Sequence, residues 1–195
     1  MGVSVSVATF VLLGIAVALL LYIVLMYNNF VRLKHNVAQA WSNIDVLLKQ
    51  RHDELPKLVA VCQQYIQHER AVLEHVTQAR ASVGQAREAR DVAALGAAED
   101  RLRVGLTGLF AVAENYPELR ANESFQDLRN RISSLEAQIA DRREFYNDSV
   151  NANNVRIEQF PDVIVARLLN FVPRELLVFS DEEKKDVDLK ALFQA

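Results

Sequence analysis

The side chains best suited to chemistry in this sequence are four histidines and one cysteine. They are His35, His52, His68, His75 and Cys62. A di-iron helical bundle needs Glu-x-x-His pairs, and a zinc protease needs His-Glu-x-x-His; neither spacing occurs in the sequence. His68 and His75 share a helical face but lie about 10 Å apart along the axis, too far to hold one metal ion. The spacing therefore predicts no metal, cofactor or catalytic site.

Other catalytic signatures are also missing from the sequence. It has no glycine-rich phosphate loop, no Gly-x-Ser-x-Gly elbow and no paired cysteines. Cys62 falls on an apolar helical stripe, where a buried, inert thiol is expected rather than a nucleophile. We expect a protein without catalytic activity, with an enzyme as the distant alternative.

The elements that carry these side chains are predicted to be helices. The chain of 195 residues is 51% hydrophobic and 24% charged, and it contains six glycines and four prolines. A composition with few helix breakers and abundant Ala, Leu, Gln, Glu and Arg is typical of an all-α protein. The net charge of −3 argues against a polybasic protein that binds nucleic acid.

Four blocks of the chain carry apolar residues at helical spacing. They cover residues 30–48, 55–83, 92–116 and 125–139. The last block contains Phe125, Leu128, Ile132, Leu135 and Ile139, at steps of three and four. Such a seam is typical of helices that pack nearly parallel or antiparallel, so each stripe is expected to cover another.

The residues between the blocks predict where the helices begin. Asp53 can cap a helix whose first turn tolerates Pro56, and Asp91 and Asn122 can cap the next two. Pro117 is expected to stop the helix before it. The apolar stripe nearly keeps its phase across residues 51–55, so one kinked helix through Pro56 is the alternative to a break at Asp53.

Residues 3–27 form an apolar run without a charged side chain. As a helix the run spans about 37 Å, against a hydrocarbon core of about 30 Å, so residues 1–30 are predicted to form a transmembrane anchor. A cleaved secretory signal is the competing interpretation. It fits less well, because the run is long and no Lys or Arg precedes it.

Basic residues near the run lie on its C-terminal side, beginning with Arg32 and Lys34. By the positive-inside rule, the N-terminus is expected outside and the helical domain in the cytoplasm. Gly14 and Ala18 form a small-xxx-small pair within the run, a weak indication of a homo-oligomer.

From the anchor onward the sequence resembles the LemA family. The resemblance lies in residues 27–33 (YNNFVRL), 40–46 (AWSNIDV), 51–56 (RHDELP), 113–123 (AENYPELRANE) and 142–148 (RREFYND). It implies a single-pass bacterial membrane protein with an antiparallel, up-and-down four-helix bundle, here over residues 31–160, and no established activity. Some members of that family belong to the magnetosome membrane, which implies organelle biogenesis as an alternative role.

An up-and-down bundle would return parts of the chain to the membrane. The basic residues expected at the membrane flank are Arg32, Lys34, Arg80, Arg87 and Arg90. The last region, 161–195, is predicted to hold a short apolar helix and an acidic tail at 181–188. Its apolar residues could either enter the lipid interface or cover the end of the bundle.

Polar residues interrupt the fourth stripe where it continues past Ile139. The candidate interaction surface consists of Tyr146, Asn147, Asn153 and Phe171. Such groups could bind the polar groups of a partner or of lipid heads, or form a satisfied hydrogen-bond network.

Three functions are compatible with this pattern. The first is an interaction scaffold at the cytoplasmic membrane, with a membrane or cytoplasmic protein as partner. The second is a module that binds lipid headgroups or shapes the bilayer. The third is an enzyme, although the sequence has no acid, base and nucleophile at suitable spacing. The expected partners are the lipid bilayer and a protein, with no nucleic acid and no cofactor.

Overall fold

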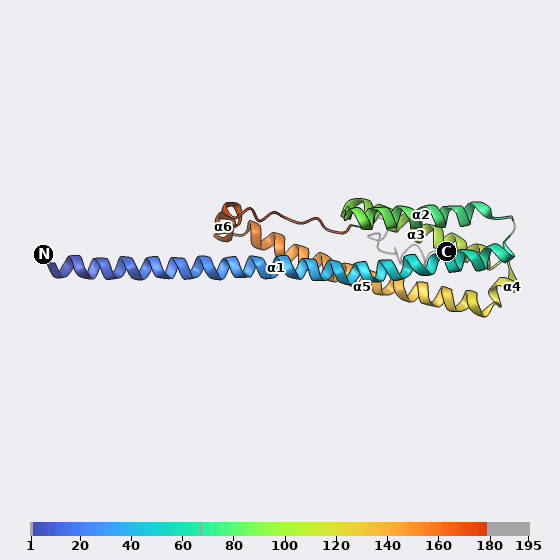
Figure 1. The fold of residues 1–195 in the computed structure, drawn as a ribbon, viewed down its shortest axis with the longest axis horizontal. Coiled ribbons are helices and arrows are strands. Elements are labelled where there is room, and N and C mark those ends of the chain that lie inside the picture. The colour runs from blue at the N-terminus through green and yellow to red at the C-terminus, as the bar shows by residue number, and fades with distance from the viewer. Residues whose placement is uncertain (1, 67, 179–195) are drawn as a thin grey trace, which may run out of the picture. The chain divides into compact units, whose positions relative to one another are not determined.

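The computed structural model describes residues 2–66 and 68–178, and every regular element in those ranges is a helix. The helices are α1 (Gly2–Tyr65), α2 (Arg70–Ala89), α3 (Val92–Ala113), α4 (Pro117–Arg120), α5 (Glu123–Glu158) and α6 (Asp162–Leu168), shown in Figure 1. The predicted all-α class is confirmed. The acidic tail predicted at 181–188 lies outside the described residues.

The chain divides into two compact units. Unit 1 comprises Met1–Ala40 and Asp148–Arg174, and unit 2 comprises Trp41–Asn147 and Glu175–Ala195. The long helices α1 and α5 therefore contribute one part to each unit. Unit 1 contains the apolar run and α6, whereas unit 2 contains α2, α3 and α4.

Unit 2 is an antiparallel four-helix bundle. α1 and α5 run in opposite directions, because Asn122 is hydrogen-bonded to Tyr65 whereas Trp41 contacts Tyr146. The hairpin of α2 and α3 lies beside them, with its two helices side by side in Figure 1. The bundle is thus made of the second part of α1, α2, α3 and the first part of α5. The predicted bundle fold is confirmed.

The predicted apolar stripes form the core of this bundle. In the last block, Phe125 and Ile132 are fully buried. The fully buried residues of the other three blocks include Ile44, Leu58, Val76, Leu95, Leu102, Leu106 and Leu109. Burying such side chains is the main favourable contribution to folding, at about 1.5–3 kcal/mol for each fully buried residue.

The predicted helix start at Asp53 is wrong. α1 continues through Pro56 to Tyr65, and the chain turns between Tyr65 and Arg70. The apolar block at 55–83 is therefore divided between α1 and α2. The alternative of one continuous helix is confirmed.

A side chain from α2 explains why α1 continues through Pro56. Proline has no N–H, so the carbonyl of His52, four residues earlier, loses its helical donor. The Nε of Arg80 donates a hydrogen bond to that carbonyl at 2.9 Å. The guanidinium group thus replaces the backbone donor that proline removes.

We expect Arg80→Met to lower the free energy of unfolding by about 1–3 kcal/mol, because it leaves the carbonyl of His52 without a donor. The same substitution should cost much less when combined with Pro56→Ala, since alanine at position 56 supplies the missing N–H. Urea unfolding of all four forms, followed by helical circular dichroism, measures both costs. An equal cost of Arg80→Met in both backgrounds would refute this role.

The other predicted helix starts are confirmed. The side chain of Asp91 accepts a hydrogen bond from the N–H of Ala94 at 2.8 Å, and that of Asn122 accepts one from Phe125 at 3.0 Å. α3 ends at Ala113, and Pro117 is the first residue of the one-turn helix α4. These side chains pair backbone donors that the first turn of a helix leaves free.

Candidate functional site

In unit 1, α6 packs against α1 where the apolar run ends. Met26 and Phe30 of α1 are buried with Ile157 of α5 and Ala166 of α6. Phe171 stacks on the ring of Phe30, with centroids 4.9 Å apart. The last turn of the apolar run is therefore part of the core of unit 1.

The opposite face of α6 exposes apolar side chains. Phe160, which precedes the helix, is 76% exposed, and Ile164 and Leu168 are 60% and 78% exposed. Ile164 and Leu168 are four residues apart in the helix and so lie on one helical face. The exposed Arg167 is in the last turn of the same helix. α6 is thus apolar both where it packs on unit 1 and where it faces outward.

An ion pair between a half-buried arginine and a buried aspartate holds the start of α6. Asp162 is buried, and its carboxylate lies 3.1 Å from Nε of Arg156 on α5. A buried carboxylate without a cation would be strongly unfavourable, so this pair ties α6 to the end of α5.

Within the described residues, one helix is long and apolar enough to cross a membrane, and that is α1 from Thr9 onward. Large apolar side chains along this stretch are exposed, including Phe10, Leu13, Leu20 and Leu25. An uncovered apolar surface of this length is not stable in water and needs an apolar environment.

The predicted interaction surface contacts the C-terminal part of the chain. In unit 2, Glu175–Val178, here called the strap, lies against α5 and α3. The hydroxyl of Tyr146 donates to the carbonyl of Glu175 at 3.1 Å. The amide of Asn147 donates to the carbonyl of Leu177 at 3.1 Å and accepts from its N–H at 2.9 Å.

In unit 1 the other asparagines make a similar contact. The amide of Asn154 donates to the carbonyl of Arg174 and accepts from its N–H, both at 2.8 Å. Asn153 is buried and donates to Asn154 at 3.2 Å. Tyr146, Asn147 and Asn154 thus bind backbone groups of the same chain, and contact of the predicted surface with a partner stays a prediction.

Three of the predicted membrane-flank arginines, Arg32, Arg80 and Arg87, have partners within the chain. Arg32 donates to Asn29 at 2.8 Å, and Arg80 binds the carbonyl of His52. Arg87 lies 3.6 Å from Asp45 on α1. Arg90 has a left-handed conformation with φ of 54° and ends α2. Lys34 is exposed.

Unit 2 has a charged centre that the sequence reasoning missed. Arg51 is 3% exposed, and its Nη2 donates to both carboxylate oxygens of Glu99, which is also buried. Its Nη1 lies 4.0 Å from Glu136. Burial raises the pKa of the Glu136 carboxyl, although the positive charge of Arg51 opposes that shift. A cavity of about 90 Å³ adjoins these three side chains and Arg103.

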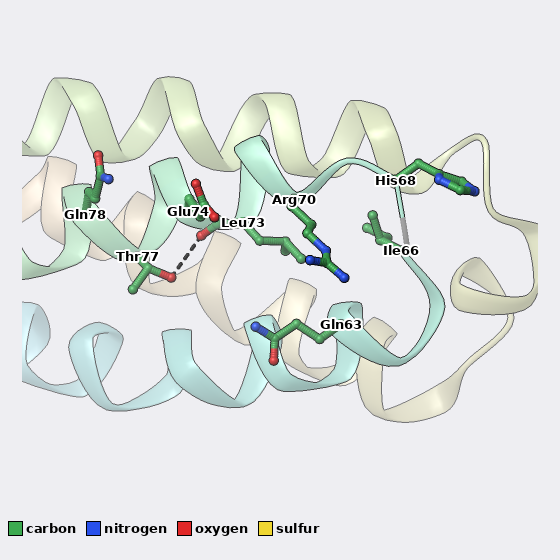
Figure 2. Close-up of a pocket in the computed structure, with 8 residues that line it drawn as sticks. All are labelled: Gln63, Ile66, His68, Arg70, Leu73, Glu74, Thr77 and Gln78. Carbon is green, nitrogen blue, oxygen red and sulfur yellow. Dashed lines mark hydrogen bonds between the residues drawn. The ribbon is translucent and has the colours of Figure 1, made fainter.

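A larger cleft lies where α1 turns into α2. Its volume is about 950 Å³, and Figure 2 shows its lining, with Ile66 and Leu73 among polar side chains that include His68, Arg70 and Glu74. In that view His68 and Glu74 lie well apart, and the marked hydrogen bond joins Thr77 to the carbonyl of Leu73 at 2.8 Å. No acid, base and nucleophile converge among these labelled residues.

The predicted environment of Cys62 is confirmed. The thiol is fully buried, and burial raises its pKa to about 12, so it is a poor nucleophile. Among residues 2–66 and 68–178, no three His, Cys, Asp or Glu side chains are placed to hold a metal ion.

Comparison with known proteins connects this architecture to a family. A model of the LemA family matches residues 40–190. Magnetosome proteins MamQ 2 and MamQ 1 of Paramagnetospirillum magneticum are each 24% identical to the chain over 178 residues. Magnetosome protein MamQ of Magnetospirillum gryphiswaldense is 21% identical. Each alignment covers 80% of this chain, which spans 65% of the length of these relatives.

Proposed function

This chain belongs to the LemA family, and from that premise we propose that it is a membrane-anchored scaffold without catalytic activity, in which α6 contacts the membrane surface. The apolar run is the anchor in this proposal, and unit 2 presents the surfaces that other membrane or cytoplasmic proteins bind. The packing of α6 on the end of the apolar run is the observation that carries the proposal.

Retention of the apolar run is supported by Met26. A signal peptidase that cut after the run would remove a side chain that is only 3% exposed in the core of unit 1. Phe30 and Ala166 would then lose part of their cover, at about 2–5 kcal/mol for a deleted buried methionine.

The place of α6 supports contact with lipid. Met26 and Tyr27 are the last turn of a run sized for the hydrocarbon core, so an element packed there lies near the lipid interface. Its exposed face joins Ile164 and Leu168 with Arg167, the combination of apolar and basic groups that interfacial helices use. The basic residues after the run support a cytoplasmic location of the helical domain, at the inner membrane, as part of this proposal.

A second candidate function follows from the similarity to the MamQ proteins. Magnetosome proteins serve an organelle, so a role in forming or shaping a membrane compartment is the alternative. The exposed face of α6 would supply the bilayer contact that such a role needs. Cells that lack the chain should then lose an internal membrane rather than a protein complex.

The lipid contact of α6 is tested with an environment-sensitive fluorophore on the full chain in vesicles. Leu168→Cys gives a labelling site, while buried Cys62 with its raised pKa resists the reagent. We expect blue-shifted emission that a nitroxide on the lipid chains quenches strongly, because the label enters the interface.

Val104→Cys is the matched control, since Val104 is 59% exposed on α3 of unit 2. We expect emission typical of water and little quenching at that position. Equal and weak quenching at both positions would contradict the proposed contact of α6 with lipid.

A further inference from the structure

A pocket of about 350 Å³ lies in unit 2, between α1 and the corner that joins α2 to α3. We call it the corner pocket. The aromatic and charged side chains that line it are Trp41, Asp45, Arg87, Glu88 and Arg90. Sites for small molecules begin at about 300 Å³, so the corner pocket suits a small polar group rather than a macromolecule.

Arg90 occupies a position that normally takes glycine. It follows α2 with φ of 54° and ψ of 33°, in the left-handed region. Its N–H donates to the carbonyl of Arg87 at 3.1 Å, and the N–H of Asp91 donates to the carbonyl of Ala86 at 3.0 Å. This is the Schellman pattern of a helix end, where glycine avoids the strain that a Cβ causes. The backbone therefore does not explain this arginine, whose exposed side chain lines the corner pocket.

Arg87 brings a second guanidinium group to the corner pocket. Its Nη1 lies 3.6 Å from the carboxylate of Asp45, which is longer than a hydrogen bond. Its Nε has no hydrogen-bond partner among the described residues. Arg87 and Asp45 thus attract each other without forming the short, two-bond pair that would saturate both groups.

The corner pocket combines both signs of charge around an indole ring. Two guanidinium groups, of Arg87 and Arg90, face a ligand together with two carboxylates, of Asp45 and Glu88. A simple anion would meet the carboxylates, and a simple cation would meet the guanidinium groups. The indole of Trp41 attracts ammonium groups, and the C-terminal end of α2 carries partial negative charge. Guanidinium groups, in turn, match phosphate and carboxylate oxygens.

We propose that the corner pocket binds a small zwitterionic group that carries both a phosphate and an ammonium. The phosphate contacts Arg87 and Arg90. The ammonium contacts Asp45 and the ring of Trp41. Phosphoethanolamine is a simple compound of this class, and the same group occurs in lipid headgroups and in free solutes. The site goes beyond the proposed function, because neither the anchor nor the contact of α6 with lipid is needed for it.

Trp41 is the one tryptophan of the chain, so its fluorescence reports on the corner pocket alone. We expect phosphoethanolamine, added to the full chain in micelles of an uncharged maltoside detergent, to change this emission in a saturable way. It should bind at least about tenfold more tightly than inorganic phosphate or ethanolamine, because each of these carries half of the group. Titration calorimetry measures the same constants without the indole. The proposal would be overturned by the absence of saturable binding in both measurements, or by equal affinity for phosphate alone.

Arg90→Gly separates binding from folding. Glycine suits the left-handed conformation, so this variant should unfold at the same urea concentration as the unsubstituted chain or at a higher one. Its affinity for phosphoethanolamine should fall at least about tenfold, because one guanidinium group is lost. Arg101→Ala is the matched control, since Arg101 is exposed on α3 and does not line the corner pocket. It should leave the affinity unchanged.

Two results with these variants would count against the site. Unchanged affinity in Arg90→Gly would mean that the guanidinium group at the helix end does not contact the ligand. An equal loss in Arg101→Ala would mean that the emission follows the overall charge of the chain. Because both variants are measured in micelles, a failure of α6 to contact lipid cannot produce either result.

Vesicles then identify the source of the group. The full chain is placed in vesicles of phosphatidylethanolamine or of phosphatidylglycerol, and phosphoethanolamine is added to each. A response in phosphatidylglycerol vesicles alone identifies the lipid headgroup as the occupant, because the other lipid already fills the corner pocket. An equal response in both identifies a free solute. The absence of a response in both would contradict the binding measured in micelles and overturn the proposal for the chain in a bilayer.

Discussion

Replacing Leu12 and Leu19 together by arginine is expected to release the full chain from membranes. Both side chains are exposed near the middle of the apolar run, so nothing in the described protein covers them. Each arginine near the centre of a transmembrane helix costs about 2.5–3.5 kcal/mol, and two cost about 5–7 kcal/mol. Extraction of cell membranes with alkaline carbonate, which strips proteins that lie only on the surface, measures the change.

The control adds the same charges outside the run, as Val46→Arg with Val104→Arg. Both valines are exposed on helices of unit 2. The control should remain in the carbonate-resistant fraction with the unsubstituted chain. Retention of the Leu12→Arg and Leu19→Arg chain in that fraction would mean that the run does not hold the protein in the bilayer.

The bundle core was predictable because burial follows a period that one sequence displays. Phe125, Ile132 and Ile139 recur at helical spacing, and the structure buries all three. Helix starts at Asp91 and Asn122 were predictable as well, since a cap involves residues only three positions apart. Local chemistry of this kind does not depend on the rest of the chain.

The continuation of α1 through Pro56 could not be predicted in the same way. Proline removes a local donor, and the replacement is Arg80, which another helix supplies. Only the packing of α2 on α1 brings that guanidinium group to the carbonyl of His52. A rule that considers neighbours in sequence therefore predicts a break where the folded protein has none.

For two other features, the buried ion pair and the asparagine contacts, the sequence shows one residue of each interaction but not its partner. Arg51 and Glu99 each occupy an apolar-stripe position, Arg51 between Leu48 and Leu55, and this spacing was an unused signal of a buried charge. The polar segment at 146–154 indicated a hydrogen-bond network or a binding surface, and Asn147 binds Leu177, which lies 30 residues later. A single sequence shows that such a residue needs a partner and does not show which one.

Glu99→Ala is expected to lower the free energy of unfolding by about 3–5 kcal/mol. The substitution leaves the buried guanidinium of Arg51 with Glu136 at 4.0 Å as its remaining carboxylate partner. Glu54→Ala provides a comparison on α1, because it breaks a pair with the exposed Lys57 at 2.9 Å and should cost about 0–1 kcal/mol. Urea unfolding of the full chain in micelles, followed by helical circular dichroism, gives both values.

Two causes could produce that loss: an unpaired charge left in the core, or the removal of a stabilising ion pair. The double replacement Arg51→Met with Glu99→Leu distinguishes them. An apolar pair of similar size pays no desolvation cost, so the double variant should be as stable as the unsubstituted chain or about 1–4 kcal/mol more stable. The loss in Glu99→Ala would then come from an unpaired buried charge, and the ion pair would serve to fix how α3 packs on α1. If the double variant is instead as unstable as Glu99→Ala, the pair itself stabilises the bundle, and this explanation fails.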